Sequence, residues 1–307
     1  MLSRFLDPKN DFAFKKVFGT EKHKDILIHF INDVLGQSEV IKGDIKVVAV
    51  EFLSPIQDPE ALAKKQSIVD VLCKDQNGKK YIIEMQVARR EGFESRAQYY
   101  AAKAYTNQMD KGGLYEDLKE VIFIAILDYE VFPKKAHYKS NHTIRDDLTN
   151  ERDLDGLRFV FIELPRFDKK LEELSTMLEK WCYFFKYAQE TTPEELAQLV
   201  KNEPIIKEAY EALDSYYWNE QDLMRYEHEL KNEWDAKAIL RYRERVAREA
   251  AEKEAREAVE KSEKIGIEKG KTEERREMAK KMQTAGIALE IIKKVTGLKI
   301  EEIGKLD

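Results

Sequence analysis

Hydrophobic residues in the first half of the chain change between helical and strand periodicity. Helical spacing and capping residues predict a helix from Asn10 to Phe18 that closes at Gly19, a second helix over residues 26–35 that ends at Gly36, and a third over about residues 94–109. Apolar runs predict strands over residues 45–53, 121–127 and 157–164, and two more on either side of Asn77-Gly78. Residues 133–155 are polar and predict a long loop. A strand–helix–strand connection after an antiparallel hairpin gives an α/β fold, with a mixed sheet flanked by helices.

The second half of the chain is predicted to be helical. Leu171, Leu174, Leu178, Trp181 and Phe185 mark one helix, and Pro193 and Pro204 open two more, the last reaching about Tyr217. A long charged helix is expected from about residue 220 toward residue 262, with a weak inner seam of Ala236, Ile239, Val246, Ala250, Ala255 and Ala258. Such a surface is typical of a solvated spacer or of a marginal coiled coil.

The C-terminal residues form a separate predicted segment. Gly266 and Gly270 predict a flexible joint, and residues 272–307 then regain apolar periodicity in short helices separated at Gly286 and Gly297. This pattern favours a small helix-turn-helix-like module, or a helical cap or oligomerisation segment. The predicted domains are a core over residues 1–165, a helical subdomain over 166–219, a charged helix or linker over 220–271, and the module over 272–307.

The hairpin around Asn77-Gly78 decides where its acidic residues lie. A two-residue turn would pair Asp70 with Met85 and place Glu84 on the opposite face of the sheet. A three-residue loop over residues 76–78, ending in a left-handed Gly78, pairs Asp70 with Glu84. We predict the three-residue loop.

Two carboxylates and an amide then occupy strands that otherwise resemble core. Ile68, Leu72 and Ile82 are expected to share the face of Asp70, Glu84 and Gln86. A buried carboxylate is unfavourable unless it is paired or holds a metal ion. The pair is therefore a candidate metal site, and the alternative is two acids on exposed strand faces.

These residues resemble a known family. Asp70, the hairpin and Glu84-Met85-Gln86 are similar to the D…(D/E)-x-K signature of PD-(D/E)XK nucleases. The opening motif, residues 7–19 beginning Asp7-Pro8-Lys9-Asn10-Asp11, and the later Arg96-Ala97-Gln98-Tyr99-Tyr100 resemble the recombination-promoting nuclease and putative transposase branch of that superfamily. The resemblance runs over residues 1 to about 164, with a weaker echo at the C-terminus. The resemblance implies a restriction-endonuclease-like fold and Mg²⁺ or Mn²⁺ held by Asp70, Glu84 and the carbonyl of Met85.

The remaining site residues follow from the same comparison and from local spacing. Gln86 stands where the signature has lysine, so it brings no charge, and a cation would have to come from elsewhere. Asp11 and Lys15 are candidates to complete the catalytic site with Asp70, Glu84 and Gln86. Their spacing is also that of an ordinary salt bridge on a helix.

Composition limits how the chain would bind DNA. The 307 residues carry a net charge of −6, so nucleic-acid contacts need a local basic patch. Lys64-Lys65, Arg89-Arg90 and Arg96 bracket the acidic strands and are predicted phosphate contacts, although basic doublets are also common on solvated surfaces.

Other features narrow the setting. Cys73 and Cys182 are predicted to be buried free thiols in a reducing compartment. His137 and His142 have no neighbouring cysteine, which argues against zinc. The chain lacks a long apolar run, so the expectation is a soluble, cytoplasmic protein with no membrane partner.

Two functions of different class fit these features. The first is a Mg²⁺-dependent DNA endonuclease that acts in recombination or in a mobile-element-like process. The alternative is a catalytically weak DNA-binding or assembly protein that retains the nuclease scaffold. A homo-oligomer formed through the C-terminal helices is expected as a further partner interaction.

Overall fold

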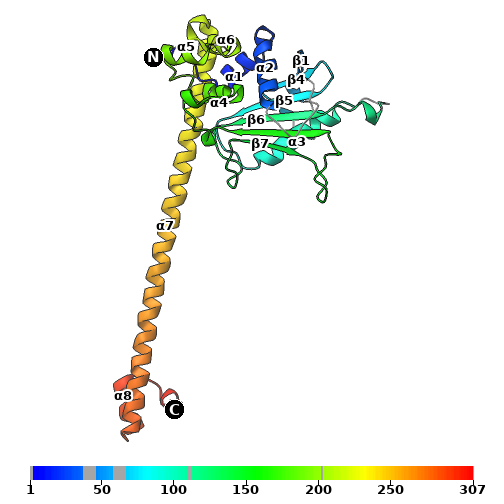
Figure 1. The fold of residues 1–307 in the computed structure, drawn as a ribbon. Helices are drawn as coiled ribbons and strands as arrows, with labels where there is room; N and C mark the ends of the chain where they lie inside the picture. Colours follow the sequence, from blue (N-terminus) through cyan, green and yellow to red (C-terminus); the bar gives the residue numbers. More distant parts are fainter. Residues whose placement is uncertain (1–2, 37–45, 58–66, 110–112, 202, 307) are drawn as a thin grey trace. The chain divides into compact units, whose positions relative to one another are not determined.

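The computed structural model describes residues 3–36, 46–57, 67–109, 113–201 and 203–306, and these divide into two compact units, Met1–Asn232 and Glu233–Asp307. In the described part of the first unit, six strands form a mixed sheet in the order β1 (Val50–Phe52), β4 (Val71–Asp75), β5 (Lys80–Gln86), β6 (Val121–Leu127), β8 (Leu157–Glu163) and β7 (Lys139–Thr143) (Figure 1). Strands β5, β6 and β8 are parallel, and the others pair antiparallel. Outside this sheet, β2 (Ile56–Gln57) pairs with β3 (Ser67–Ile68).

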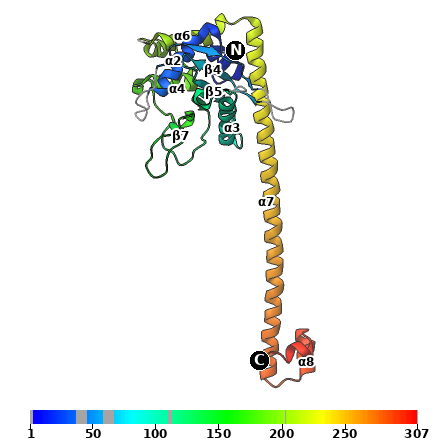
Figure 2. The same ribbon diagram turned by 90° about the vertical axis from the view of Figure 1, so that its right-hand side faces the viewer.

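Helices cover both faces of the sheet. One face carries α1 (Asp11–Phe18), α2 (Lys24–Leu35), α4 (Met177–Tyr187) and α6 (Pro204–Leu213), and the other carries α3 (Phe93–Thr106) (Figure 2). Between α1 and α4, Phe14 and Phe18 pack against Phe185, and the ring centroids of the three residues lie 4.9–6.2 Å apart. Helix α3 presents the small residues Ala97, Ala101 and Ala104, which let it lie close to β6. Helix α5 (Pro193–Leu199) and 3₁₀ turns at Glu21–His23, Tyr115–Asp117, Leu164–Arg166, Leu171–Glu173 and Ser215–Tyr217 complete this unit as described.

The hairpin has the predicted register. Val71 pairs with Ile83 and Leu72 with Ile82, so the same register places Asp70 opposite Glu84. The Gly78 amide donates to the Asp75 carbonyl at 3.0 Å, the Asp75 amide donates to the Lys79 carbonyl at 2.9 Å, and Gly78 has a φ of 82°. The three-residue loop over residues 76–78 is therefore confirmed.

Two strand predictions were incomplete. Strand β7 lies inside residues 133–155, for which the sequence predicts a loop. Its sequence, Lys-Ser-Asn-His-Thr, has little apolar character because it is an edge strand held by backbone pairing to β8. Strand β1 is only three residues long, and residue 45, where the sequence predicts this strand to begin, lies outside the described residues.

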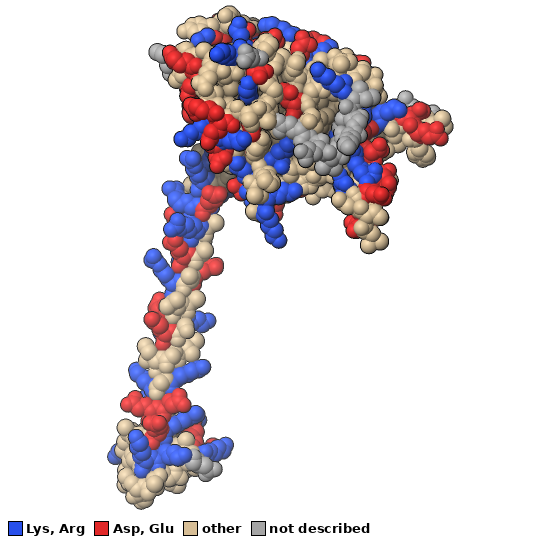
Figure 3. All heavy atoms as spheres, in the orientation of Figure 1, with Lys and Arg blue, Asp and Glu red and all other residues tan. Residues whose placement is uncertain are grey.

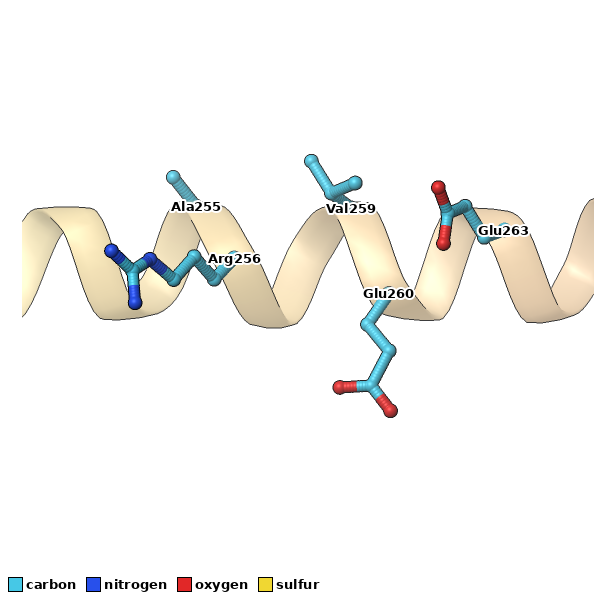
Figure 4. A pocket seen from close by; sticks show the side chains of 5 residues that line it. All are labelled: Ala255, Arg256, Val259, Glu260 and Glu263. Atoms are coloured by element: carbon cyan, nitrogen blue, oxygen red, sulfur yellow. The ribbon is translucent and has the colours of Figure 1, made fainter.

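Helix α7 (Glu220–Thr284) runs through Gly266 and Gly270, so the flexible joint predicted at these glycines is wrong. A Cβ added at either glycine would have open space around it, and an isolated glycine in a helix costs only about 1 kcal/mol. The predicted seam is solvated, with Ile239 55% and Val246 44% exposed. Basic and acidic side chains are intermixed along α7 in Figure 3, and Figure 4 shows Ala255 and Val259 on one side of an exposed stretch.

The second unit has a small core of its own. The end of α7 packs with α8 (Leu289–Thr296) and α9 (Ile300–Ile303) through Ala279, Ile292, Leu298 and Ile303. Gly297 ends α8 in the left-handed conformation with a φ of 70°, as expected for a helix terminator. In the described part of the chain, no helix has the length and apolar character needed to cross a membrane.

We expect Gly78→Ala to destabilise the protein by about 1 kcal/mol, because an L-residue is strained in the left-handed conformation. An added Cβ would meet only the Lys119 side chain, at 3.4 Å, so the backbone is the cause. Urea unfolding measures the change. Asn77→Ala in the same loop is the control, and equal shifts in the two variants would contradict this explanation.

Candidate active site

The two acids meet where strand pairing ends. At Val69 the chain turns away from β5, and its amide donates to the Pro55 carbonyl. The amide of Met85 donates instead to Oδ2 of Asp70 at 2.9 Å, and the amide of Asp70 donates to Oε1 of Glu84 at 3.3 Å. Both carboxylates are thus anchored by backbone amides at the open end of the hairpin.

The apolar surroundings of the pair differ in part from expectation. Leu72 and Ile82 are buried on the α3 face, as predicted. Ile68 was expected on the same face, but it lies in β3 and is 58% exposed, because the chain leaves the main sheet before Asp70. The burial of Glu84, which is 3% exposed, therefore comes from the central strands and from α3.

Gln86 connects Glu84 to a cation. Its Nε2 donates to Oε2 of Glu84 at 3.0 Å, and its Oε1 accepts from Nη2 of Arg96 at 2.7 Å. The Arg96 guanidinium lies 5.1 Å from the centre of the Phe93 ring and 6.0 Å from that of Tyr100. Arg96, predicted as a phosphate contact, is therefore half-buried on α3 with a neutral amide between it and the acid pair.

Helix α1 brings a second cation. Nζ of Lys15 lies 2.7 Å from Oδ1 of Asp11 and 3.5 Å from Oδ1 of Asp70, so the i,i+4 pair and the proximity to the acid pair are both present. The buried Asn10 side chain begins the helix by accepting from the Phe12 and Ala13 amides. The side chains of Lys15 and Asp11 are 37% and 50% exposed, so the site is open to solvent on this side.

Burial changes the charge of the acid pair. The pKa of Asp70 is raised to about 6, chiefly by burial and also by the charge of Asp11, while the Met85 amide and Lys15 oppose the shift. Burial, followed by the charge of Asp70, raises the pKa of Glu84 to about 8 against the effect of Arg96. Burial disfavours the Lys15 ammonium, yet hydrogen bonds and charge from Asp11 and Asp70 raise its pKa overall. Both shifts favour the protonated acids, so ionisation of both carboxyl groups together is unfavourable unless a further cation lies beside them.

These donors suit a hard divalent cation. Carboxylate and carbonyl oxygens are the protein ligands preferred by Mg²⁺. A strand residue directs its N–H and C=O to the same side, so the Met85 carbonyl faces the side of the strand on which its amide meets Asp70. Among the described residues, no group of three or more His, Cys, Asp or Glu side chains is arranged to hold a metal.

The other predicted and newly found residues lie around this pair. Arg89 and Arg90 are exposed in the connection from β5 to α3, whereas Lys64 and Lys65 lie outside the described residues. Sequence reasoning missed Asp128, whose amide donates to the Gln86 carbonyl at 2.9 Å and whose carboxylate binds Nζ of Lys9 at 2.9 Å. Two sequence features could have indicated this pair: Lys9 belongs to the opening motif, and Asp128 directly follows the apolar run of β6.

The two cysteines and His142 have different surroundings. Cys73 and Cys182 are buried free thiols, as predicted. Nε2 of His142 lies 3.0 Å from Oγ of Ser140.

A mixed sheet with flanking helices, followed by a helical C-terminal region, defines a protein with the PD-(D/E)XK fold. Residues 8–243 match the family described as PD-(D/E)XK nuclease family transposase, and the chain belongs to this family. The match extends to residue 243, beyond residue 164, where the stronger part of the resemblance was expected to end. Membership indicates a nuclease-like function, and nucleases of this superfamily generally use divalent metals. No curated protein and no solved structure matches the chain.

We expect Glu84→Gln to remove a pH-dependent destabilisation of the metal-free protein. A carboxyl whose folded pKa is raised loses stability as pH rises from its unfolded value, about 4.3, to its folded value, about 8. The wild type should therefore lose at least about 1 kcal/mol relative to the variant between pH 5 and pH 9.

Urea unfolding in a metal chelator measures this difference across the pH range. Glu116→Gln, at an exposed position, is the matched control and should parallel the wild type. Parallel stability curves for Glu84→Gln and the wild type would contradict the assigned burial of charge.

Proposed function

We propose that the protein is a metal-dependent DNA endonuclease that hydrolyses phosphodiester bonds in recombination or in a mobile-element-like process. The observation that carries this proposal is the pair Asp70 and Glu84, anchored by amides at the end of the hairpin and raised in pKa. The exposed side chains of Asp11 and Lys15 leave an approach for substrate. Family membership supports a nuclease reaction on DNA.

The proposed ligands are the carboxylates of Asp70 and Glu84 and the carbonyl of Met85. A bound Mg²⁺ or Mn²⁺ would neutralise phosphate charge and make water a better nucleophile. Gln86 is a positioning residue in this proposal, because both ends of its amide are occupied by Glu84 and Arg96. It holds the Glu84 carboxylate in place and keeps the Arg96 charge at a distance.

Lys15 is the proposed replacement for the signature lysine. It reaches Asp70 from α1, on the exposed side of the site, whereas Gln86 carries no charge. An ammonium at this place would approach the phosphate and offset the negative charge that develops as water attacks phosphorus and the bond to the leaving oxygen breaks. Asp11 holds the ammonium in position through its ion pair.

The proposed DNA contacts lie beside this centre. Arg89 and Arg90 follow the strand that bears Glu84, and exposed guanidinium groups there suit backbone phosphates. Arg96 would act through Gln86, and Lys64 and Lys65 are retained as phosphate contacts from sequence alone.

We also propose self-association through the C-terminal helices. Its support is the exposure of apolar side chains there, including Ile239, Leu240 and Val295, each more than half exposed. Sedimentation equilibrium of the full chain measures it, and a monomer at all concentrations would exclude it.

A second candidate is a DNA-binding or assembly protein that cleaves weakly or not at all. Two observations favour it. Gln86 stands at the signature position, so no lysine there can meet the phosphate, and both ends of its amide are already bound to Glu84 and Arg96. The two candidates share the scaffold and the DNA partner, and they differ in whether bound metal leads to cleavage.

We expect Asp70→Asn to lower Mg²⁺-dependent plasmid nicking by at least about 100-fold, because loss of a catalytic electrostatic group commonly has this effect. Lys15→Met should also slow nicking while leaving Mn²⁺ binding measurable by calorimetry. Asp117→Asn, at an exposed position, is the matched control.

Circular dichroism verifies that each variant folds. Full activity in folded Asp70→Asn would exclude the proposed site. Mn²⁺ binding by the wild type without nicking of any DNA substrate would favour the second candidate.

A further inference from the structure

An aromatic cavity lies on the α3 face of the sheet, away from the acid pair. Its volume is about 280 Å³, below the usual range for drug-sized ligands, so it suits one small group. Residues from α3, β7, β8 and the segment before β7 line it. They include Glu94, Gln98, Phe132, His142, Phe159 and Phe161.

The walls of this aromatic cavity suit a flat ring. Phe132 and His142 pack on each other, with ring centroids 4.9 Å apart and planes only 33° from parallel, so they form one aromatic wall rather than two facing ones. Phe161 meets both edge-on, at 5.1 Å from Phe132 and 5.3 Å from His142, and it is 4% exposed. Phe132, His142 and Phe159 are only partly buried, so aromatic surface is available to a ligand.

Polar groups at the cavity distinguish it from a plain apolar groove. Glu94 and Gln98, one turn apart on α3, provide a carboxylate and an amide, and Nε2 of Gln98 also donates to the Glu94 carbonyl at 3.2 Å. Lys135 places its ammonium 5.5 Å from the centre of the Phe132 ring. A ligand with a flat ring, hydrogen-bonding edges and a nearby negative charge would match all three features.

The sheet connects this cavity to the acid pair. Glu84 pairs with Ala125, and Ala125 pairs with Phe161, so the three residues form one row across parallel strands. Neighbouring strands lie about 4.8 Å apart, which places the backbones of Glu84 and Phe161 about 10 Å apart on one sheet. Helix α3 serves both places, with Arg96 near Gln86 and Glu94 at the cavity.

We propose that the aromatic cavity receives one unstacked nucleobase of the DNA strand that is bound at the acid pair. The assignment rests on the proposed function, since it takes DNA as the substrate. Phe132 and His142 would stack on the base, Glu94 and Gln98 would contact its edge, and Lys135 would contact a neighbouring phosphate. Stacking of this kind tolerates every base, while the Glu94 carboxylate favours bases that offer amino hydrogens.

The test uses the full-length protein and a short single-stranded oligonucleotide that contains 2-aminopurine, in a metal chelator so that cleavage is not required. Fluorescence anisotropy gives the affinity, and 2-aminopurine emission reports stacking. Phe132→Ala should weaken binding roughly 5- to 150-fold and restore the quenched emission. Phe132→Leu keeps apolar volume in case the first variant is unstable, and it should also restore emission. Tyr115→Ala, at an 83% exposed aromatic position, is the control and should match the wild type.

Unchanged affinity and emission in folded Phe132→Leu would overturn the nucleobase assignment. The same result accompanied by altered self-association would assign the cavity to a second copy of the chain and would also overturn it. Base stacking that depends on Phe132 supports the assignment even if the wild type fails to nick DNA, in which case only the endonuclease proposal fails. If nicking depends on Asp70 but base stacking does not depend on Phe132, the endonuclease proposal stands and the nucleobase assignment fails.

Discussion

The site depends on two carboxyl groups held side by side where water cannot fully solvate them, so that their simultaneous ionisation is unfavourable. Strand pairing ends between β4 and β5, and the backbone amides released there bind the carboxylates of Asp70 and Glu84. Those amides offset only part of the unfavourable burial, because the pKa of each acid is raised. The remaining imbalance makes this end of the hairpin a place where a cation would be stabilised.

The nearby cations come from different layers of the fold and act differently. Lys15 reaches Asp70 from α1 on one face of the sheet, and it is partly exposed. Arg96 comes from α3 on the other face and touches the acid pair only through the Gln86 amide. A lysine in place of Gln86 would bring a full charge onto Glu84, whereas the amide orders the carboxylate and leaves its charge in place.

Much of this arrangement follows from local sequence, and the rest depends on tertiary contacts. The loop over residues 76–78 and strand β6 were predictable, because Gly78 allows a positive φ and an apolar run marks a strand buried on both faces. Strand β7 was not, because its polar residues are held by backbone pairing with β8. The link from Gln86 to Arg96 was also unpredictable in detail, since the packing of α3 on the sheet sets it. The joint predicted at Gly266 and Gly270 was wrong because a helix tolerates isolated glycines at a small cost in stability.

The docking of α1 has a consequence for the order in which the protein matures. Phe14 and Phe18 of this helix pack on Phe185 of α4, and Phe5 just before it bridges to Asp214 after α6. Synthesis of the acidic hairpin is complete at residue 86, but these partners of the amino-terminal segment are synthesised more than 90 residues later. On the ribosome, a nascent chain would therefore hold both acids well before Lys15 is held beside them, and the complete centre forms only after the helical region has emerged.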